Sequence, residues 1–269
     1  MTIGSTCRRN ARLLFVAAAG LLALPTALPA QAGRGPGGPP PSPKAAAPIN
    51  MTGYWVSVVT EDWRYRMVTP AKGDYLSVPI NAESKRVADA WDPARDEAAG
   101  EQCKSYGAAG IMRLPERVHV TWQDDNTMRM DIDAGTQTRL FHFGRWKAPD
   151  SAPTWQGDSV AQWELQPPPP NTMGQPQPAA GPPKSGSLKI TTTHMRAGYL
   201  RKNGVPYSEN AVLTEYYDVI REHDGNLWLI LTSVVRDPLY LQQPFILSTH
   251  FKKESDGSKW DPTPCSARW

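Results

Sequence analysis

Hydrophobic alternation with a period of two residues is the feature that most constrains the fold of this 269-residue chain. In a strand, successive side chains point to opposite faces, so alternation predicts a half-buried β-strand. Residues 54–60 (YWVSVVT) add a β-branched, aromatic run typical of a strand. The alternating segments are residues 117–122, 128–132, 136–143, 158–165, 187–194, 212–221, 226–236 and 244–253. We therefore predict about nine strands.

Helical spacing of apolar side chains is limited to one clear segment, residues 81–90, with Asn81 as the predicted N-cap. This helix should end before Pro93, because proline disfavours helical geometry in the residue that precedes it. Residues 96–102 add a further helical turn. Since helices do not alternate with strands, the predicted class is all-β: an antiparallel barrel or a strongly bent sheet with a short helical excursion.

A proline-rich segment, residues 166–186 (QPPPPNTMGQPQPAAGPPKSG), separates two of the predicted strands. Loop closure costs only about 0.6 kcal/mol for each doubling of loop length, so a long insertion at a hairpin tip is thermodynamically cheap. We expect a disordered insertion within a single domain of residues 49–269, with a linker between two small domains as the alternative. The segment is also a candidate docking site for a protein partner that reads proline-rich peptides.

The first 32 residues have the pattern of a signal peptide. Arg8, Arg9 and Arg12 precede an apolar run, and Ala30-Gln31-Ala32 is a small-x-small cleavage site. A retained anchor and a twin-arginine route are alternatives, although prolines interrupt the apolar run before about 20 residues. Residues 33–48 are rich in glycine, proline and alanine, which predicts a flexible tether. The expected location is periplasmic or secreted, with no membrane span after the signal is removed.

Export changes the expected charge and the expected chemistry of the cysteines. Removing residues 1–32 leaves 26 basic and 26 acidic residues, a formal net charge of 29 − 3 − 26 = 0. This balance argues against nucleic-acid binding, which needs a basic surface. In an oxidising compartment the two remaining cysteines, Cys103 and Cys265, favour a disulfide over two separate thiols.

Several short motifs, taken in chain order, carry a resemblance to a known family. They include Trp91-Asp92-Pro93, residues 153–164 (PTWQGDSVAQWE), residues 187–193 (SLKITTT) and Asp237-Pro238. The chain resembles a large family of secreted, lipocalin-like β-barrel proteins of bacteria that are known only as uncharacterised. In that family the Trp-Glu strand turns almost directly into the next strand, whereas residues 166–186 separate them here. The resemblance implies fold and compartment but no catalytic residue.

Candidate catalytic side chains are few. No HxH, CxxC or histidine pair at helical spacing occurs, so we expect no metal and no cofactor. Strand parity allows His142, His194 and His250 to point into a barrel, where His142 and His194 with Arg139 could act as acid, base or anion holder. Hydrogen-bonded rim histidines are the alternative. For Glu215 we expect a solvated carboxylate.

The aromatic composition favours a binding function. Ten tryptophans and nine tyrosines against five phenylalanines suit a binding surface or cavity wall, because indole and phenol rings carry a polar group that seeks a partner. The alternative is that large side chains simply fill a small barrel. The predicted ligand-binding residues are Trp55, Arg113, Trp122, Trp163, Tyr217 and Trp228.

The leading functional hypothesis is therefore an exported β-barrel that binds a small, partly apolar or aromatic molecule in its interior. Whether the protein is an enzyme is left open. A cofactor-independent isomerase or lyase using barrel-lining His and Arg is one alternative. An interaction module of the cell envelope is the other.

Overall fold

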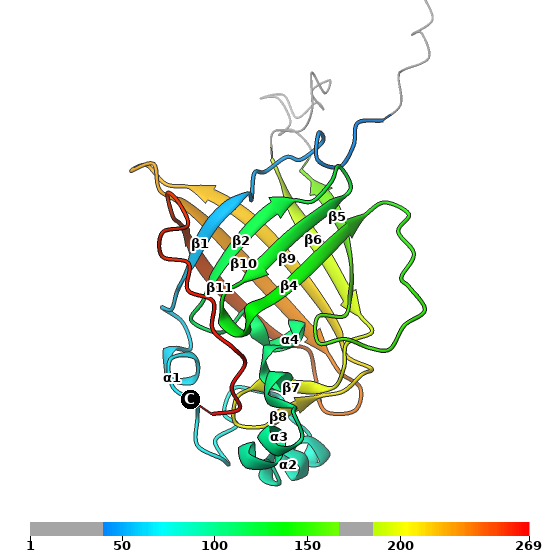
Figure 1. The fold of residues 1–269 in the computed structure, drawn as a ribbon, viewed down its shortest axis with the longest axis vertical. Helices are drawn as coiled ribbons and strands as arrows, with labels where there is room; N and C mark the ends of the chain where they lie inside the picture. Colours follow the sequence, from blue (N-terminus) through cyan, green and yellow to red (C-terminus); the bar gives the residue numbers. More distant parts are fainter. Residues whose placement is uncertain (1–39, 167–184, 269) are drawn as a thin grey trace, which may run out of the picture. The chain divides into compact units, whose positions relative to one another are not determined.

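Nine strands close into a barrel in the computed structural model, which describes residues 40–166 and 185–268 (Figure 1). The predicted signal peptide, the first part of the predicted tether and residues 167–184 of the proline-rich segment lie outside the described residues. Around the barrel the order is β1, β11, β10, β9, β6, β5, β4, β3 and β2, which pairs again with β1. The bounds are β1 Gly53–Val58, β2 Arg117–Trp122, β3 Thr127–Ile132, β4 Gln137–Phe143, β5 Asp158–Leu165, β6 Gly186–Thr193, β9 Val212–Arg221, β10 Leu227–Arg236 and β11 Phe245–Lys253.

Side chains along each strand point alternately into the barrel and out to its surface, which explains the two-residue alternation in the sequence. Along β4, Arg139, Phe141 and Phe143 are buried, whereas Leu140 and His142 between them are partly exposed. The same pattern in the other strands fills the interior with large side chains that are at most 1% exposed. These are Trp55, Val118, Val120, Met128, Met130, Ile132, Phe141, Leu188, Ile190, Tyr217, Leu229, Leu231 and Phe251. The all-β barrel prediction is confirmed.

One pair of neighbouring strands departs from the antiparallel expectation. β4 and β5 run parallel, with Phe141 opposite Ser159 and Phe143 opposite Ala161. A hairpin turn can join only antiparallel strands, and here residues 144–157 form a longer connection that lets β5 enter the sheet from the same end as β4. The alternation within each strand does not predict whether two neighbouring strands run parallel or antiparallel.

The proline-rich segment separates two strands that pair directly with each other. β5 and β6 pair antiparallel along their whole length, from Asp158 opposite Thr193 to Leu165 opposite Gly186. A further backbone bond of 3.2 Å from the Gln166 amide to the Ser185 carbonyl continues this pairing. Residues 167–184 therefore connect two strands that are already adjacent.

Short elements gather at one end of the barrel, the lower end in Figure 1. They are α2 (Ala82–Asp89), α3 (Pro93–Ala98), α4 (Ala108–Ile111) and a small hairpin of β7 (Gly198–Arg201) and β8 (Val205–Tyr207). In α2 the predicted N-cap is confirmed, because the Asn81 side chain accepts a 2.8 Å bond from the Ser84 amide. The β7–β8 hairpin was not predicted, although Asn203-Gly204 in its turn is a strong hairpin signal.

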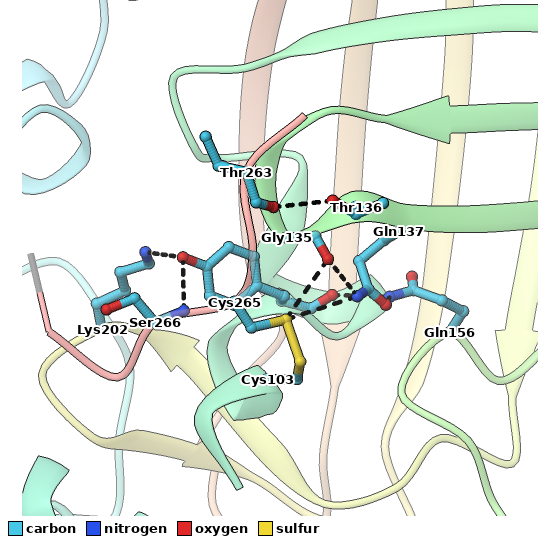
Figure 2. The surroundings of a disulfide bond; sticks show 10 residues. Cys103, Gly135, Thr136, Gln137, Gln156, Lys202, Thr263, Cys265 and Ser266 are labelled. Atoms are coloured by element: carbon cyan, nitrogen blue, oxygen red, sulfur yellow. Dashed lines mark hydrogen bonds between the residues drawn. A yellow bond between two sulfur atoms is a disulfide. The ribbon is translucent and has the colours of Figure 1, made fainter. Parts of the chain in front are cut away.

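The predicted disulfide joins the C-terminal segment to this end of the barrel (Figure 2). Cys103, in the 3₁₀ helix η1 (Gln102–Tyr106), is bonded to Cys265, with the two Cα atoms 5.1 Å apart. Next to the bond, the Thr136 hydroxyl donates to the Thr263 carbonyl at 3.0 Å. Thr263 and Cys265 thus fasten the C-terminal segment by one hydrogen bond and one covalent bond.

Candidate anion-binding site

Four basic side chains line one small cavity beside the β7–β8 hairpin. They come from three parts of the chain: Arg66 ends the short helix α1 (Trp63–Arg66), Arg113 follows α4, Arg201 ends β7 and Lys202 comes directly after it. Together we call their surroundings the cationic pocket. Its volume is about 20 Å³, enough for one water-sized group such as a single oxygen of an anion. The lining also includes Tyr65, Val68, Thr69, Pro70, Ser105, Gly110, Leu114 and Leu200, and contains no carboxylate.

Arg66 is fixed by three partners. Its Nε donates to the Arg113 carbonyl at 2.8 Å and its Nη2 to the Ser57 hydroxyl at 3.0 Å, while Nη1 forms an ion pair with Glu61. Burial lowers the pKa of Arg66, and Glu61 opposes this effect. Arg66 therefore connects the end of β1 to the segment after α4 and holds the wall of the pocket in place.

Arg113 is the least satisfied base of the pocket. Its residue is 6% exposed, and only Nη2 reaches a carboxylate, Asp62, at 3.3 Å. Nε and Nη1 have no hydrogen-bond partner among the described residues. Burial, and then the nearby charge of Arg201, lowers the pKa of Arg113 to about 9. A buried guanidinium with two open donors beside a second guanidinium is an environment that a bound anion would stabilise.

Arg201 is bonded to the loop that follows α1. Its Nη1 donates to the Leu76 carbonyl at 2.7 Å and its Nη2 to the Ser77 hydroxyl at 2.9 Å, and its guanidinium lies 4.3 Å from the centre of the Tyr65 ring. Nε has no partner among the described residues. Arg201 thus fastens the loop and still has one donor open.

Lys202 connects the pocket to the disulfide region. Its Nζ donates to the Tyr106 hydroxyl at 2.7 Å, and the same hydroxyl accepts a 3.3 Å bond from the Ser266 amide of the C-terminal segment (Figure 2). Burial lowers the pKa of Lys202 to about 7, although the nearby Glu116 carboxyl raises it. The charge of Lys202 therefore changes near neutral pH.

Glu116 is a buried acid close to these bases. Burial and the charge of Asp133 raise the pKa of its carboxyl well above its ordinary value, against the lowering effects of Arg66, Arg139 and Lys202. Neither carboxyl oxygen has a hydrogen-bond partner among the described residues. Burial therefore opposes the charged form of Glu116 beside the pocket.

The barrel interior holds a separate ion pair in which both terminal nitrogens of Arg139 are bonded to protein groups, while its Nε has no partner among the described residues. Arg139 and Glu215 form two hydrogen bonds of 2.8 and 2.5 Å, and the Tyr217 hydroxyl donates to Glu215 at 3.0 Å. The expectation of a solvated Glu215 is wrong. Its position in the alternation of β9 directs the side chain into the barrel, where the residue is 0% exposed. Arg139 is therefore a structural partner of Glu215 in this structure.

The predicted histidines do not share a face with Arg139. His142 and His250 alternate with the buried Phe143 and Phe251 and so lie on the outer face, which corrects the expectation that they point inward. The His142 ring stacks on Trp146 at 4.0 Å. His194 follows β6 and its Nδ1 lies 2.8 Å from an Asp158 carboxylate oxygen at the barrel rim.

The predicted ligand-binding residues are distributed over the molecule. Trp55 and Tyr217 are completely buried in the core, and the Trp55 indole donates to the Met51 carbonyl at 2.8 Å. Trp122 and Trp163 lie together, with ring centres 6.5 Å apart. Trp228 occupies an outward position of β10, with Lys252 6.0 Å from its ring. Of the set, only Arg113 lines the cationic pocket.

Sequence reasoning identified one base of the pocket and missed the others as a group. Residues 62–70 stand out as an aromatic and basic cluster containing Arg66, and Arg201-Lys202 precedes the Asn203-Gly204 turn. Nothing in the sequence pairs these two segments with Arg113. Their proximity depends on the β7–β8 hairpin packing across the end of the barrel.

No family model, curated protein or solved structure matches this chain, so membership of the lipocalin-like family stays a prediction. None of the described helices has the length and apolar character needed to cross a membrane. Within residues 40–166 and 185–268, no group of three or more His, Cys, Asp or Glu side chains is placed to hold a metal ion.

Proposed function

We propose that this protein is an exported binding protein with a lipocalin-like barrel, and that the cationic pocket holds the anionic group of a small, partly apolar molecule. The observation that carries the proposal is the set of open donors in the pocket: Nε and Nη1 of Arg113 and Nε of Arg201, with no carboxylate in the lining. A carboxylate or phosphate oxygen accepts charge-assisted hydrogen bonds from such donors.

The loop after α1 supplies the surface for an apolar part of the ligand. Val68 lines the pocket and is 65% exposed, and the same loop exposes Met67 and Leu76, next to the exposed Trp63 of α1. Arg64 pairs with Asp74 at 2.8 Å, and Arg201 joins Tyr65 to Leu76, so the two ends of the loop are held together. Exposed apolar side chains next to a cationic cavity favour an amphiphilic ligand.

The location of the site differs from the hypothesis of an interior ligand. The rings that could line an internal cavity, above all Trp55 and Tyr217, are already packed in the core. An interior ligand would have to displace them. The export part of the proposal rests on the signal-like residues 1–32 and on the disulfide, which persists in oxidising compartments.

Calorimetric titration with matched acids and amides tests the proposal. Decanoate and indole-3-acetate should bind at least about tenfold more tightly than decanamide and indole-3-acetamide, because only the acids can accept bonds from the open donors. Arg113→Gln and the near-isosteric Thr69→Val should weaken acid binding, and inorganic phosphate should compete. Thr69 is chosen because its buried hydroxyl also lacks a partner among the described residues.

The matched control is Arg95→Gln, whose side chain is 83% exposed on α3. It removes the same charge without touching the pocket and should leave binding unchanged. Equal affinity for acid and amide, or equal affinity of the Arg113 and Arg95 variants, would overturn the proposal. If neutral aromatic molecules bind the parent chain and the Arg113→Gln variant with the same affinity, a binding site elsewhere on the barrel is favoured instead.

A further inference from the structure

A proline-containing segment of the chain lies across the end of the barrel opposite the cationic pocket. Residues 41–48, which the sequence assigns to the tether, pass along the upper end of the barrel before β1 (Figure 1). The Trp163 indole donates a 2.8 Å bond to the Pro43 carbonyl, and the Lys44 amide donates a 3.2 Å bond to the Asp125 carbonyl. The segment is thus held by the barrel's own side chains and turns.

The surface under this segment is an aromatic cluster formed by Trp122, Phe143 and Trp163. The ring centres lie 5.3 Å (Phe143–Trp163), 5.5 Å (Trp122–Phe143) and 6.5 Å (Trp122–Trp163) apart. Both tryptophans remain partly exposed although the segment is in place. An indole N–H among aromatic rings, facing a carbonyl of a proline-rich chain, is the chemistry by which aromatic grooves recognise such peptides.

Charge complements this cluster at its edge. The turn between β2 and β3 carries the exposed acids Asp124 and Asp125, and the Lys44 ammonium lies 4.0 Å from an Asp125 carboxylate oxygen. Their side chains are 49% and 68% exposed, so this ion pair contributes little to stability. The segment is held by a few solvent-accessible contacts, which a second peptide of the same kind could replace.

We infer that the cluster of Trp122, Phe143 and Trp163 is an interaction surface for a short proline-rich peptide that carries a basic residue after its proline, and that residues 41–48 occupy it in the free protein. Trp163 provides the donor for the peptide carbonyl, and Asp125 provides the acceptor for the basic residue. This surface is independent of the cationic pocket, and a ligand in one leaves the other accessible.

The test uses the full chain and a synthetic peptide of residues 39–48 (PPPSPKAAAP), with binding followed by tryptophan fluorescence. In a Pro41→Gly/Pro43→Gly variant the chain's own segment loses the restriction that proline places on it and should compete about tenfold less well. The peptide should therefore bind this variant about tenfold more tightly than the parent chain. A peptide with its prolines replaced by glycine should bind at least about tenfold more weakly.

Trp163→Phe, added to the glycine variant, keeps an aromatic ring but removes the indole donor and should weaken peptide binding five- to tenfold. Trp228→Phe is the matched control, since Trp228 lies on the outward face of β10, and should change nothing. In the parent chain, the indole N–H signal of Trp163 should shift on peptide addition, which tests the contact without any substitution. Equal binding by parent and glycine variant, no effect of Trp163→Phe, or an unmoved Trp163 signal would each overturn the inference.

Discussion

Arg139 and Glu215 face each other inside the barrel from β4 and β9, two strands that are not neighbours in the sheet. Both side chains are at most 1% exposed, and the two hydrogen bonds between them are 2.8 and 2.5 Å long. Burial opposes the charge of Arg139, but Glu215 outweighs burial and raises the pKa of the guanidinium. The pair thus connects β4 and β9 across the interior of the barrel.

Removing one member of this pair should destabilise the fold strongly. Glu215→Met or Arg139→Met leaves the other charged group buried without its partner, and the free energy of unfolding should fall by about 3–5 kcal/mol. Denaturant unfolding followed by tryptophan fluorescence measures this. The double variant Arg139→Met/Glu215→Met should be less destabilised than the sum of the single variants. Simple additivity would show that the two groups are not coupled.

The disulfide should contribute a large share of the stability. Cys103 and Cys265 are 162 residues apart, and the chain-entropy model assigns about 5 kcal/mol to closing a loop of that length. Cys103→Ser/Cys265→Ser should therefore unfold at a much lower urea concentration than the parent, and the parent under reducing conditions should behave like the variant. Unchanged unfolding midpoints would mean that the C-terminal segment is held by its non-covalent contacts alone.

Binding of an anion at the cationic pocket should depend on pH near neutrality. The Lys202 ammonium loses its proton as pH rises through about 7, and Arg113 loses its charge through about 9. Affinity for the carboxylate ligands should therefore decrease in two steps between pH 6 and 10. Lys202→Met should remove the first step while keeping the second. A flat profile over this range would contradict the assignment of these bases to the site.

Lys202 should also affect stability: deprotonation of its ammonium weakens anion binding but should increase the free energy of unfolding. Its pKa in the folded protein lies below its ordinary value, so between about pH 7 and its ordinary pKa the unfolded chain binds more protons than the folded one. The free energy of unfolding should consequently rise with pH across this window through this group, and fall as pH drops through the folded pKa. In Lys202→Met that slope should be reduced, which urea titrations at several pH values can measure.

The turn of the β7–β8 hairpin needs glycine for two reasons. Gly204 has φ +83°, and a Cβ there would lie 2.3 Å from the Trp91 side chain. Gly225 has a similar φ of +86° but nothing within 4 Å, so it is a matched control for backbone strain alone. Gly225→Ala should cost about 1–2 kcal/mol of unfolding free energy, and Gly204→Ala clearly more. Equal losses would mean that Trp91 can move aside.

The agreement between sequence and structure is closest where the signal is local. β5 and β9 begin and end at the predicted residues, and the Asn81 cap forms as predicted, because alternation, capping and proline restrictions act within a few residues. The strands on either side of the proline-rich segment could be paired from their matching lengths and patterns. The candidate site was largely missed, because Arg66, Arg113 and Arg201 lie in segments that no local rule relates.

The amino-acid sequence by itself determined that the chain forms strands, which face of each strand is apolar and where the turns fall, since these depend on neighbouring residues. Only the tertiary structure decided that the sheet closes, that β4 and β5 run parallel, and which charged side chains become buried. Arg139 meets Glu215 from 76 positions away, and Arg66 meets Arg113 from 47 positions away. The energy of a buried charge depends on the partners that folding brings to it, and these cannot be read from its own position in the chain.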